Sequence, residues 1–416
     1  MYDRLSIRMY HVGFGDCFLV RFWKGEDPFT VLFDCGSITE GAAQVTKVAD
    51  DVITECGKGK VEPRIDLLIA THRHKDHVGG FSNPLWSKVT VGEVWMPWTE
   101  DPHDPQATKI RNRQSALALT LTGGAVDDEP LAKPPPRTVL AQLKAARMGM
   151  AMNALTNEKA MATLHSGFLG KPRRRFLPEE NTTFQERVLP DAPDLSFHIL
   201  GPSRSEAVIA SMNPPSGKGY LAASDVGIDT DRVPAFGARW QISPEQFAAE
   251  ARFDSFRDDD RKAIEASAEL PFGPLAAALD NAVNNTSLII MIECGNAMLL
   301  FPGDAQWGSW NAVLEEPKGR ALLARTTFYK VGHHGSHNAT PKEFIDSVMP
   351  AGGVALFSTC AVKQWPDIPR APLVEAIDGK AAKWARSDDE TQAKNDGFKV
   401  EPDLYVEWDV TLPIGP

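Results

Sequence analysis

One short segment joins a buried-type apolar run to a dense cluster of metal-ligand side chains. Residues 67–71 (Leu-Leu-Ile-Ala-Thr) predict a buried strand, and His72, His74, Asp76 and His77 follow at once. Histidine and carboxylate groups bind zinc and similar divalent ions. Because side chains two residues apart point the same way on an extended segment, we expect His72 and His74 to share one ion. Asp76 and His77 lie where the chain must turn, so they are placed to face a second ion.

A second histidine cluster also follows a predicted strand. Residues 327–331 predict the strand, and His333, His334 and His337 come directly after it. We expect only one of the adjacent pair His333 and His334 to bind metal. His337 is either an exposed loop residue or a group that contacts substrate or transfers a proton.

Asp304 ends a further predicted strand between the two clusters. A carboxylate in this position is the expected bridging ligand for two ions about 3.5–4 Å apart. The alternative is a helix N-cap before residues 305–310, since aspartate caps helices well.

The apolar spacing along the chain predicts an α/β (α+β) fold. The two halves of the chain repeat one order: strand, turn, strand, aspartate, helix, strand and histidine-rich loop. This repeat suggests two sheets packed face to face, with helices outside and the ligands at one end. A Gly295-Asn296 turn between two apolar runs predicts a hairpin. The strands are predicted at 5–12, 17–23, 30–34, 67–70, 91–96, 195–200, 288–293, 297–301 and 327–331, and helices at 42–56, 110–121, 139–164 and 245–269.

Two regions interrupt the strand pattern. Residues 98–190 lack clear strands, and within them the stretch from Lys133 to Arg187 holds ten lysines and arginines against four glutamates. We therefore predict a single domain over residues 1–416, with a basic helical insertion or cap at 98–190 and a second, mainly helical insertion at 203–283.

Composition limits the binding partners and the cellular locations that we expect. A formal net charge of −11 argues against a general polyanion binder, although a local basic patch remains compatible with it. The five cysteines are scattered, without zinc-ribbon or redox spacing, which is typical of a reduced compartment. No apolar run approaches the ~20 residues needed to span a bilayer, and the start of the chain has no signal-peptide pattern. The expected location is the cytoplasm, without membrane association.

Six segments together resemble the metallo-β-lactamase fold superfamily. The nearest branch is the hydrolase domain of the competence protein ComEC and its stand-alone relatives. This resemblance implies a four-layer αββα sandwich. It also implies that His72 and His74 hold one ion, that Asp76, His77 and His334 hold the other, and that Asp304 bridges them. The segments are Val12–Cys17, Phe33–Gly36, Thr71–His77, Asn284–Leu288, Phe301–Asp304 and Lys330–Ser336.

The chain departs from this family pattern in two places. Asn284 or Asn285 stands where the superfamily has its third metal histidine, which leaves the first ion with a weaker neutral ligand or with water. Relatives often carry a further histidine after the last core strand, but residues 360–369 contain none. Asp367 could substitute there, and the role of that histidine stays open for this chain.

The resemblance implies a hydrolase with two divalent ions, zinc being favoured and manganese the alternative. Two adjacent ions lower the pKa of a bridging water, so that a metal-bridging hydroxide attacks a phosphodiester, nucleic acid included. Asp34 is expected to orient a metal ligand. The catalytic candidates are Asp76, Lys75 and His337, and the candidate substrate contacts are Asn285, Ser336, Arg173, Arg174 and Arg175.

Several alternatives remain open on the sequence. A lysine in the position of Lys75 is more often a solvated loop residue than a substrate contact. The arginines 173–175 either face an anionic substrate, pair with the acidic segment 245–269, or coat a solvated surface. A small-molecule ester or lactone hydrolase is a second function. A binding or regulatory protein whose site has decayed is a third, and it is motivated by the two missing histidines.

Overall fold

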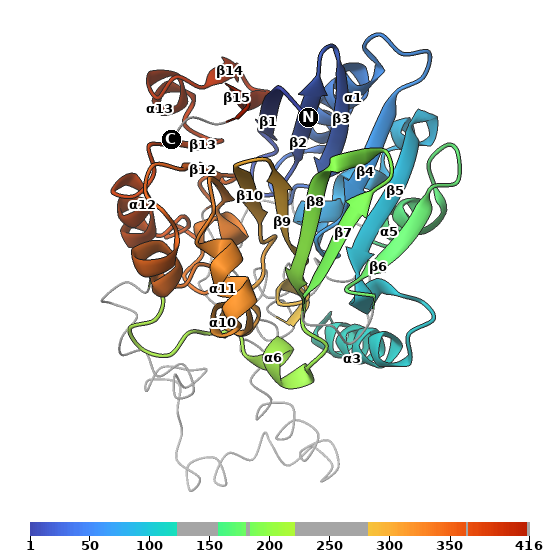
Figure 1. The fold of residues 1–416 in the computed structure, drawn as a ribbon. Helices are drawn as coiled ribbons and strands as arrows, with labels where there is room; N and C mark the ends of the chain where they lie inside the picture. The colour runs from blue at the N-terminus through green and yellow to red at the C-terminus, as the bar shows by residue number, and fades with distance from the viewer. Residues whose placement is uncertain (123–156, 180–183, 221–281, 363–364, 414–416) are drawn as a thin grey trace, which may run out of the picture.

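Two mixed β-sheets form the centre of the molecule (Figure 1). The computed structural model describes residues 1–122, 157–179, 184–220, 282–362 and 365–413. Eight strands make up the first sheet, in the order β14 (Lys399–Glu401), β15 (Tyr405–Thr411), β1 (Arg4–Tyr10), β2 (Phe18–Lys24), β3 (Asp27–Phe33), β4 (Arg64–Ile69), β5 (Thr90–Pro97) and β6 (Arg173–Leu177). Seven make up the second, in the order β13 (Lys383–Arg386), β12 (Val354–Phe357), β11 (Phe328–Lys330), β10 (Ala297–Phe301), β9 (Ile289–Cys294), β8 (Ala192–Gly201) and β7 (Gln185–Leu189).

Each sheet has an antiparallel part and a parallel part. In the first sheet β1, β2 and β3 are antiparallel neighbours, and β3 to β6 run parallel. In the second sheet β10 to β13 run parallel, and β7 to β10 are antiparallel. The carboxyl ends of the parallel strands in each sheet therefore share one edge, where loops carrying polar side chains gather.

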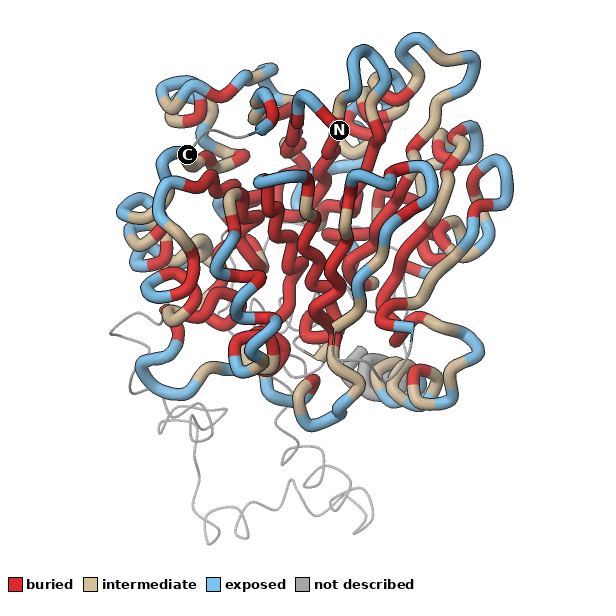
Figure 2. Tube along the Cα trace, viewed as in Figure 1, coloured by how far each residue is buried: buried red, intermediate tan, exposed pale blue. Residues whose placement is uncertain are grey.

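Alternation along the strands builds the core between the sheets. Leu5, Ile7 and Met9 of β1 belong to one buried cluster with Phe197 of β8 and Phe301 of β10. Residues one step along each strand face the other way, because successive side chains of a strand point to opposite faces. Figure 2 shows the buried stretches concentrated in the strands of both sheets.

Helices cover the outer faces of the two sheets. The first sheet packs against α1 (Ala42–Gly57), through a second buried cluster that includes Val48 and Val52. The second sheet packs against α10 (Trp307–Glu315), α11 (Pro317–Leu323) and α12 (Ala371–Asp378), through a third cluster centred on Trp310. The other described α-helices are α2 (Lys75–Val78), α3 (Pro105–Thr122), α5 (Glu158–Ser166), α6 (Glu206–Ala210) and α13 (Glu390–Asn395). None of the helices in the described ranges is long and apolar enough to cross a membrane.

Most predicted strands match the structure within a few residues. The hairpin at Gly295-Asn296 is confirmed, since Cys294 pairs with Ala297 across the turn. The prediction that residues 98–190 carry no strands is wrong: β6 extends the first sheet beside β5, and β7 forms an edge of the second. The expected acidic helix at 245–269 and most of the helix at 139–164 lie outside the described residues.

Candidate metal centre

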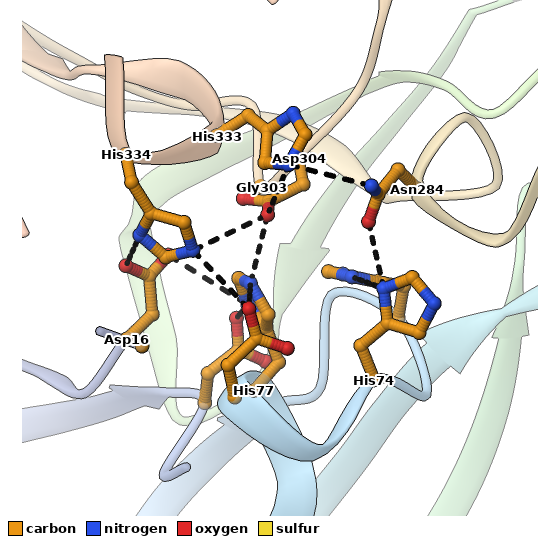
Figure 3. Close-up of polar contacts among 12 residues, drawn as sticks. Asp16, His74, His77, Asn284, Gly303, Asp304, His333 and His334 are labelled. Carbon is orange, nitrogen blue, oxygen red and sulfur yellow. Dashed lines mark hydrogen bonds and ion pairs between the residues drawn. The ribbon is translucent and has the colours of Figure 1, made fainter. Parts of the chain in front are cut away.

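Residues from both halves of the chain meet in one cluster, shown in Figure 3, and they follow β4, β10 and β11. The loop after β4 and the short helix α2 supply His72, His74, Asp76 and His77. Asp304 follows β10, and the loop after β11 supplies the second histidine cluster. The two clusters and the strand-end aspartate, which are far apart in the sequence, therefore lie together as predicted.

Close backbone packing fixes these loops. A Cβ on Gly36 would collide with the backbone of Lys75 and Asp76, so glycine lets the turn after β3 lie against the start of α2. Gly303 has φ +55°, and a Cβ there would lie 2.9 Å from Cβ of Thr71. Asp304 is held next to this contact because its backbone N–H donates to Ser287 Oγ at 3.1 Å.

The second histidine cluster has an unusual backbone. His333 and His334 have φ of 45° and 54°, a left-handed conformation that costs about 1–2 kcal/mol per residue outside glycine. His334 is held by two contacts: Nδ1 donates to the Ser358 carbonyl at 2.8 Å, and the ring packs against Phe14 with centroids 4.2 Å apart. In this conformation Nε2 of His334 faces Asp76 and Asp304.

Four side chains form one compact group of ligand atoms. Asp76, His77, Asp304 and His334 are all buried, and each offers one atom within 4.8 Å of the others. Asp304 Oδ2 lies 3.1 Å from His77 Nε2 and 3.5 Å from His334 Nε2, and His334 Nε2 lies 3.3 Å from Asp76 Oδ2. Asp304 does not cap α10, whose N-cap is Gln306, so the alternative prediction for Asp304 is wrong.

Asp34 orients His77 from behind, as predicted. His77 Nδ1 donates to Asp34 Oδ2 at 2.8 Å, and Asp34 also accepts from the backbone N–H and the hydroxyl of Thr71. Burial alone would lower the pKa of His77, but Asp304 and Asp34 raise it well above its ordinary value. In the same way, Asp304 and Asp76 outweigh burial and raise the pKa of His334.

The carboxylates of the group stay ionised. Burial alone would raise the pKa of Asp76 and of Asp304, but the neighbouring histidines hold both pKa values below the ordinary range. Carboxylate oxygens and imidazole nitrogens are both among the ligands that bind zinc in proteins. His77 Nε2 and Asp304 Oδ2 are buried and face each other at 3.1 Å, so a cation that replaces the proton between them would meet both atoms. The four side chains therefore fit a divalent ion.

His72 and His74 lie beside this group and are arranged differently. His72 Nε2 is 3.2 Å from His74 Nδ1, and His74 Nδ1 donates to Asn284 Oδ1 at 2.8 Å. Burial lowers the pKa of His72 well below its ordinary value and that of His74 to about 4, so both rings are neutral. Asn284, predicted as a weak metal ligand, directs its amide oxygen at His74. His333 Nε2 lies 3.4 Å from Asn284 Nδ2 and 3.8 Å from Asp304 Oδ2.

The residues predicted to contact substrate differ in their burial and hydrogen bonding. The prediction for Asn285 is wrong: its buried amide donates to the carbonyls of Val208 and Ile209 and accepts from the N–H of Gln306, so it holds the backbone together. Ser336 is buried and donates to Asn338 at 3.1 Å. Of the catalytic candidates, Lys75 is exposed at the first residue of α2, and His337 is half-buried.

Two of the three arginines of β6 are half-buried and bonded within the fold. Arg175 binds Glu93 through Nε at 2.6 Å, and Arg174 donates to three backbone carbonyls. Arg173 is exposed. It lies beside Glu93 of β5, and Glu93 lies beside Leu67 of β4. Arg173 is therefore level with the middle of β4, several residues before the loop that carries His72. The prediction that Arg174 and Arg175 contact an anionic substrate is wrong, because edge-strand packing occupies both side chains. Asp367 is 70% exposed and pairs with Arg370 at 3.6 Å, outside the cluster.

Two charged residues at the centre were not among the sequence-based candidates. Asp16 and Lys330 are both buried and form an ion pair behind Asp304. Burial alone would lower the pKa of Lys330, but Asp16 and Asp304 raise it above its ordinary value. The signals in the sequence were a lysine inside an apolar strand and an aspartate directly after a Gly-Phe-Gly turn.

Comparison with known proteins does not assign the chain to a family. No model of a known protein family matches the chain, and a search of curated proteins finds no match.

Zinc binding should depend on pH in a defined direction. The pKa values of His77 and His334 are raised above the ordinary imidazole value, so at any pH below those raised values an ion must displace protons from the two rings. Affinity should therefore rise with pH until those raised pKa values are passed, by up to about tenfold per pH unit for each proton released. Calorimetric titrations of the metal-free protein with zinc, in buffers of different ionisation enthalpy, measure both quantities. A pH-independent affinity without proton release would contradict these protonation states.

Proposed function

We propose that the chain is a metal-dependent hydrolase of the metallo-β-lactamase fold type that cleaves phosphodiester bonds, those of nucleic acids included. The observation that carries the proposal is the buried group of Asp76, His77, Asp304 and His334, with two imidazole nitrogens and two carboxylate oxygens converging on one point. Two sheets sharing a core, with helices outside, support an αββα sandwich. The order of the histidine motifs supports the ComEC-like branch.

The residues of the chain would divide the work of such a site. A divalent ion, once bound, supplies a Lewis acid and lowers the pKa of a water molecule. Asp34 and the Ser358 carbonyl fix the rings of His77 and His334, so that each presents Nε2. His333 is only 15% exposed and lies next to Asp304, where it is placed to meet a substrate or a leaving oxygen.

A second ion belongs at His72 and His74 in this proposal. Their nitrogen atoms lie 3.2 Å apart and the amide of Asn284 occupies one side, so a small rearrangement would precede binding there. We therefore propose that this ion is the more weakly held of the two. Zinc is favoured by the imidazole and carboxylate ligands, with manganese as the alternative.

A panel of substrates tests the reaction class. The metal-loaded protein, assayed with zinc and separately with manganese, should hydrolyse bis(p-nitrophenyl) phosphate and at least one of single-stranded DNA, duplex DNA and RNA. Asp76→Asn, which removes one charge from the group, should abolish this activity. Cleavage of p-nitrophenyl acetate or a lactone with no phosphodiesterase activity would establish the ester hydrolase instead. No turnover of any substrate, in protein shown to hold metal, would contradict hydrolase function.

A further inference from the structure

A buried ammonium group lies directly behind the candidate metal centre. Lys330 belongs to the short strand β11 and is 1% exposed. Its Nζ forms an ion pair with Asp16 Oδ2, and it lies 3.4 Å from Asp304 Oδ1 and 3.3 Å from the Gly303 carbonyl. A lysine is rarely buried to this degree unless it is paired. Its partners here are two carboxylates: Asp304, which belongs to the candidate metal centre, and Asp16, which does not.

This arrangement gives the two oxygens of Asp304 different partners. Oδ1 faces Lys330, whereas Oδ2 faces His77 at 3.1 Å and His334 at 3.5 Å. Both of these contacts of Oδ2 are therefore to histidines of the candidate metal centre. The carboxylate is therefore held in one rotation, with a single oxygen directed at the metal group.

Asp16 serves to hold the lysine in place. Asp16, Asp34 and His77 form another set of buried ligand atoms within 4.8 Å of one another. That set already has its cation, because Lys330 contacts Asp16. Asp34 is meanwhile occupied by His77 and Thr71. These residues therefore form a supporting layer behind the metal group.

We propose that Lys330, anchored by Asp16, is a positioning residue that keeps Oδ2 of Asp304 as the one oxygen of that carboxylate presented to the metal ion. The inference rests on the proposed metal centre and assigns a role to two residues that do not touch the ion. Without the ammonium group, the carboxylate of Asp304 is free to rotate and bring both oxygens to the ion. The coordination geometry then changes although every ligand is still present.

Cobalt substitution makes this change visible. The protein would be loaded with Co²⁺, whose visible absorption bands report coordination number, and wild type would be compared with Lys330→Met and with the double variant Asp16→Asn/Lys330→Met. In Lys330→Met we expect weaker, shifted bands. Activity should fall by about 10–100-fold, the usual cost of losing a group that orients a metal ligand. The melting temperature of the metal-free protein should also fall, because Asp16 and Asp304 lose their cation.

The double variant separates positioning from a purely structural ion pair. Removing Asp16 together with Lys330 should restore part of the melting temperature while leaving the altered cobalt spectrum and the reduced activity. A double variant with the wild-type spectrum and activity would overturn the inference, as would a wild-type spectrum in Lys330→Met. If Lys330→Met fails to fold, the double variant alone decides. A wild-type protein that takes up no cobalt would instead overturn the metal centre itself.

Discussion

Replacing Asp304 with asparagine should eliminate tight metal binding and reduce hydrolysis by at least about 10³-fold. Oδ2 of Asp304 is the atom that His77 and His334 both face, and the amide keeps the shape of the side chain while removing its charge. Loss of a single positioned electrostatic group already costs about 10²–10³-fold in rate. Metal content by mass spectrometry and hydrolysis of bis(p-nitrophenyl) phosphate measure the two effects.

A matched variant tests whether the loss comes from the position of Asp304 or from any change of aspartate to asparagine. Asp50→Asn makes the same chemical change at an exposed position on α1 and should leave metal content and rate unchanged. Circular dichroism should show both variants folded. Asp304→Asn protein that retains wild-type zinc and wild-type rate would remove Asp304 from the metal site.

Glu407→Gln should destabilise the protein by about 3–5 kcal/mol, the usual cost of breaking a buried ion pair. Glu407 Oε2 accepts from Arg8 Nε at 2.7 Å and from Arg21 Nη2 at 2.8 Å, and all three side chains are at least 93% buried. Removing the carboxylate charge leaves two buried guanidinium groups with less compensation, between β1, β2 and β15. Urea unfolding of the metal-free protein measures the free energy of unfolding.

An exposed pair on the same strands provides the control. Arg4 Nε donates to Asp409 Oδ1 at 2.7 Å, with side chains 46% and 32% exposed. Asp409→Asn should therefore cost about 1 kcal/mol or less. Equal losses for the two variants would show that burial does not set the strength of the Glu407 network.

The sequence predicted the strands that have a regular apolar pattern. Residues 5–12, 17–23 and 297–301 alternate or are continuously apolar, and each forms a strand close to the predicted bounds. The strand β6 was missed because Arg-Arg-Arg-Phe-Leu has no apolar alternation. Its structure comes from pairing with β5 at the sheet edge, and such tertiary context overrides local propensity.

In the candidate site too, features with a local sequence pattern were predicted, and features that depend on tertiary contacts were not. The histidine clusters and Asp304 were predictable because ligand residues stand directly after apolar strands, and parallel strands bring such loops together. Asn285 was misassigned because a sequence does not show which backbone carbonyls a fold leaves unpaired. Asp16 and Lys330 were missed because their pairing exists only once the two sheets pack.

The position of a bound divalent ion is the most direct evidence for or against the metal centre. Anomalous diffraction at the zinc edge, from crystals of the zinc-loaded protein, locates the ion without reference to activity. We expect the strongest peak about 2.0–2.2 Å from His77 Nε2, His334 Nε2 and an oxygen of Asp304. A strongest peak elsewhere in the molecule, or no peak at this group in fully loaded crystals, would contradict the proposed metal centre.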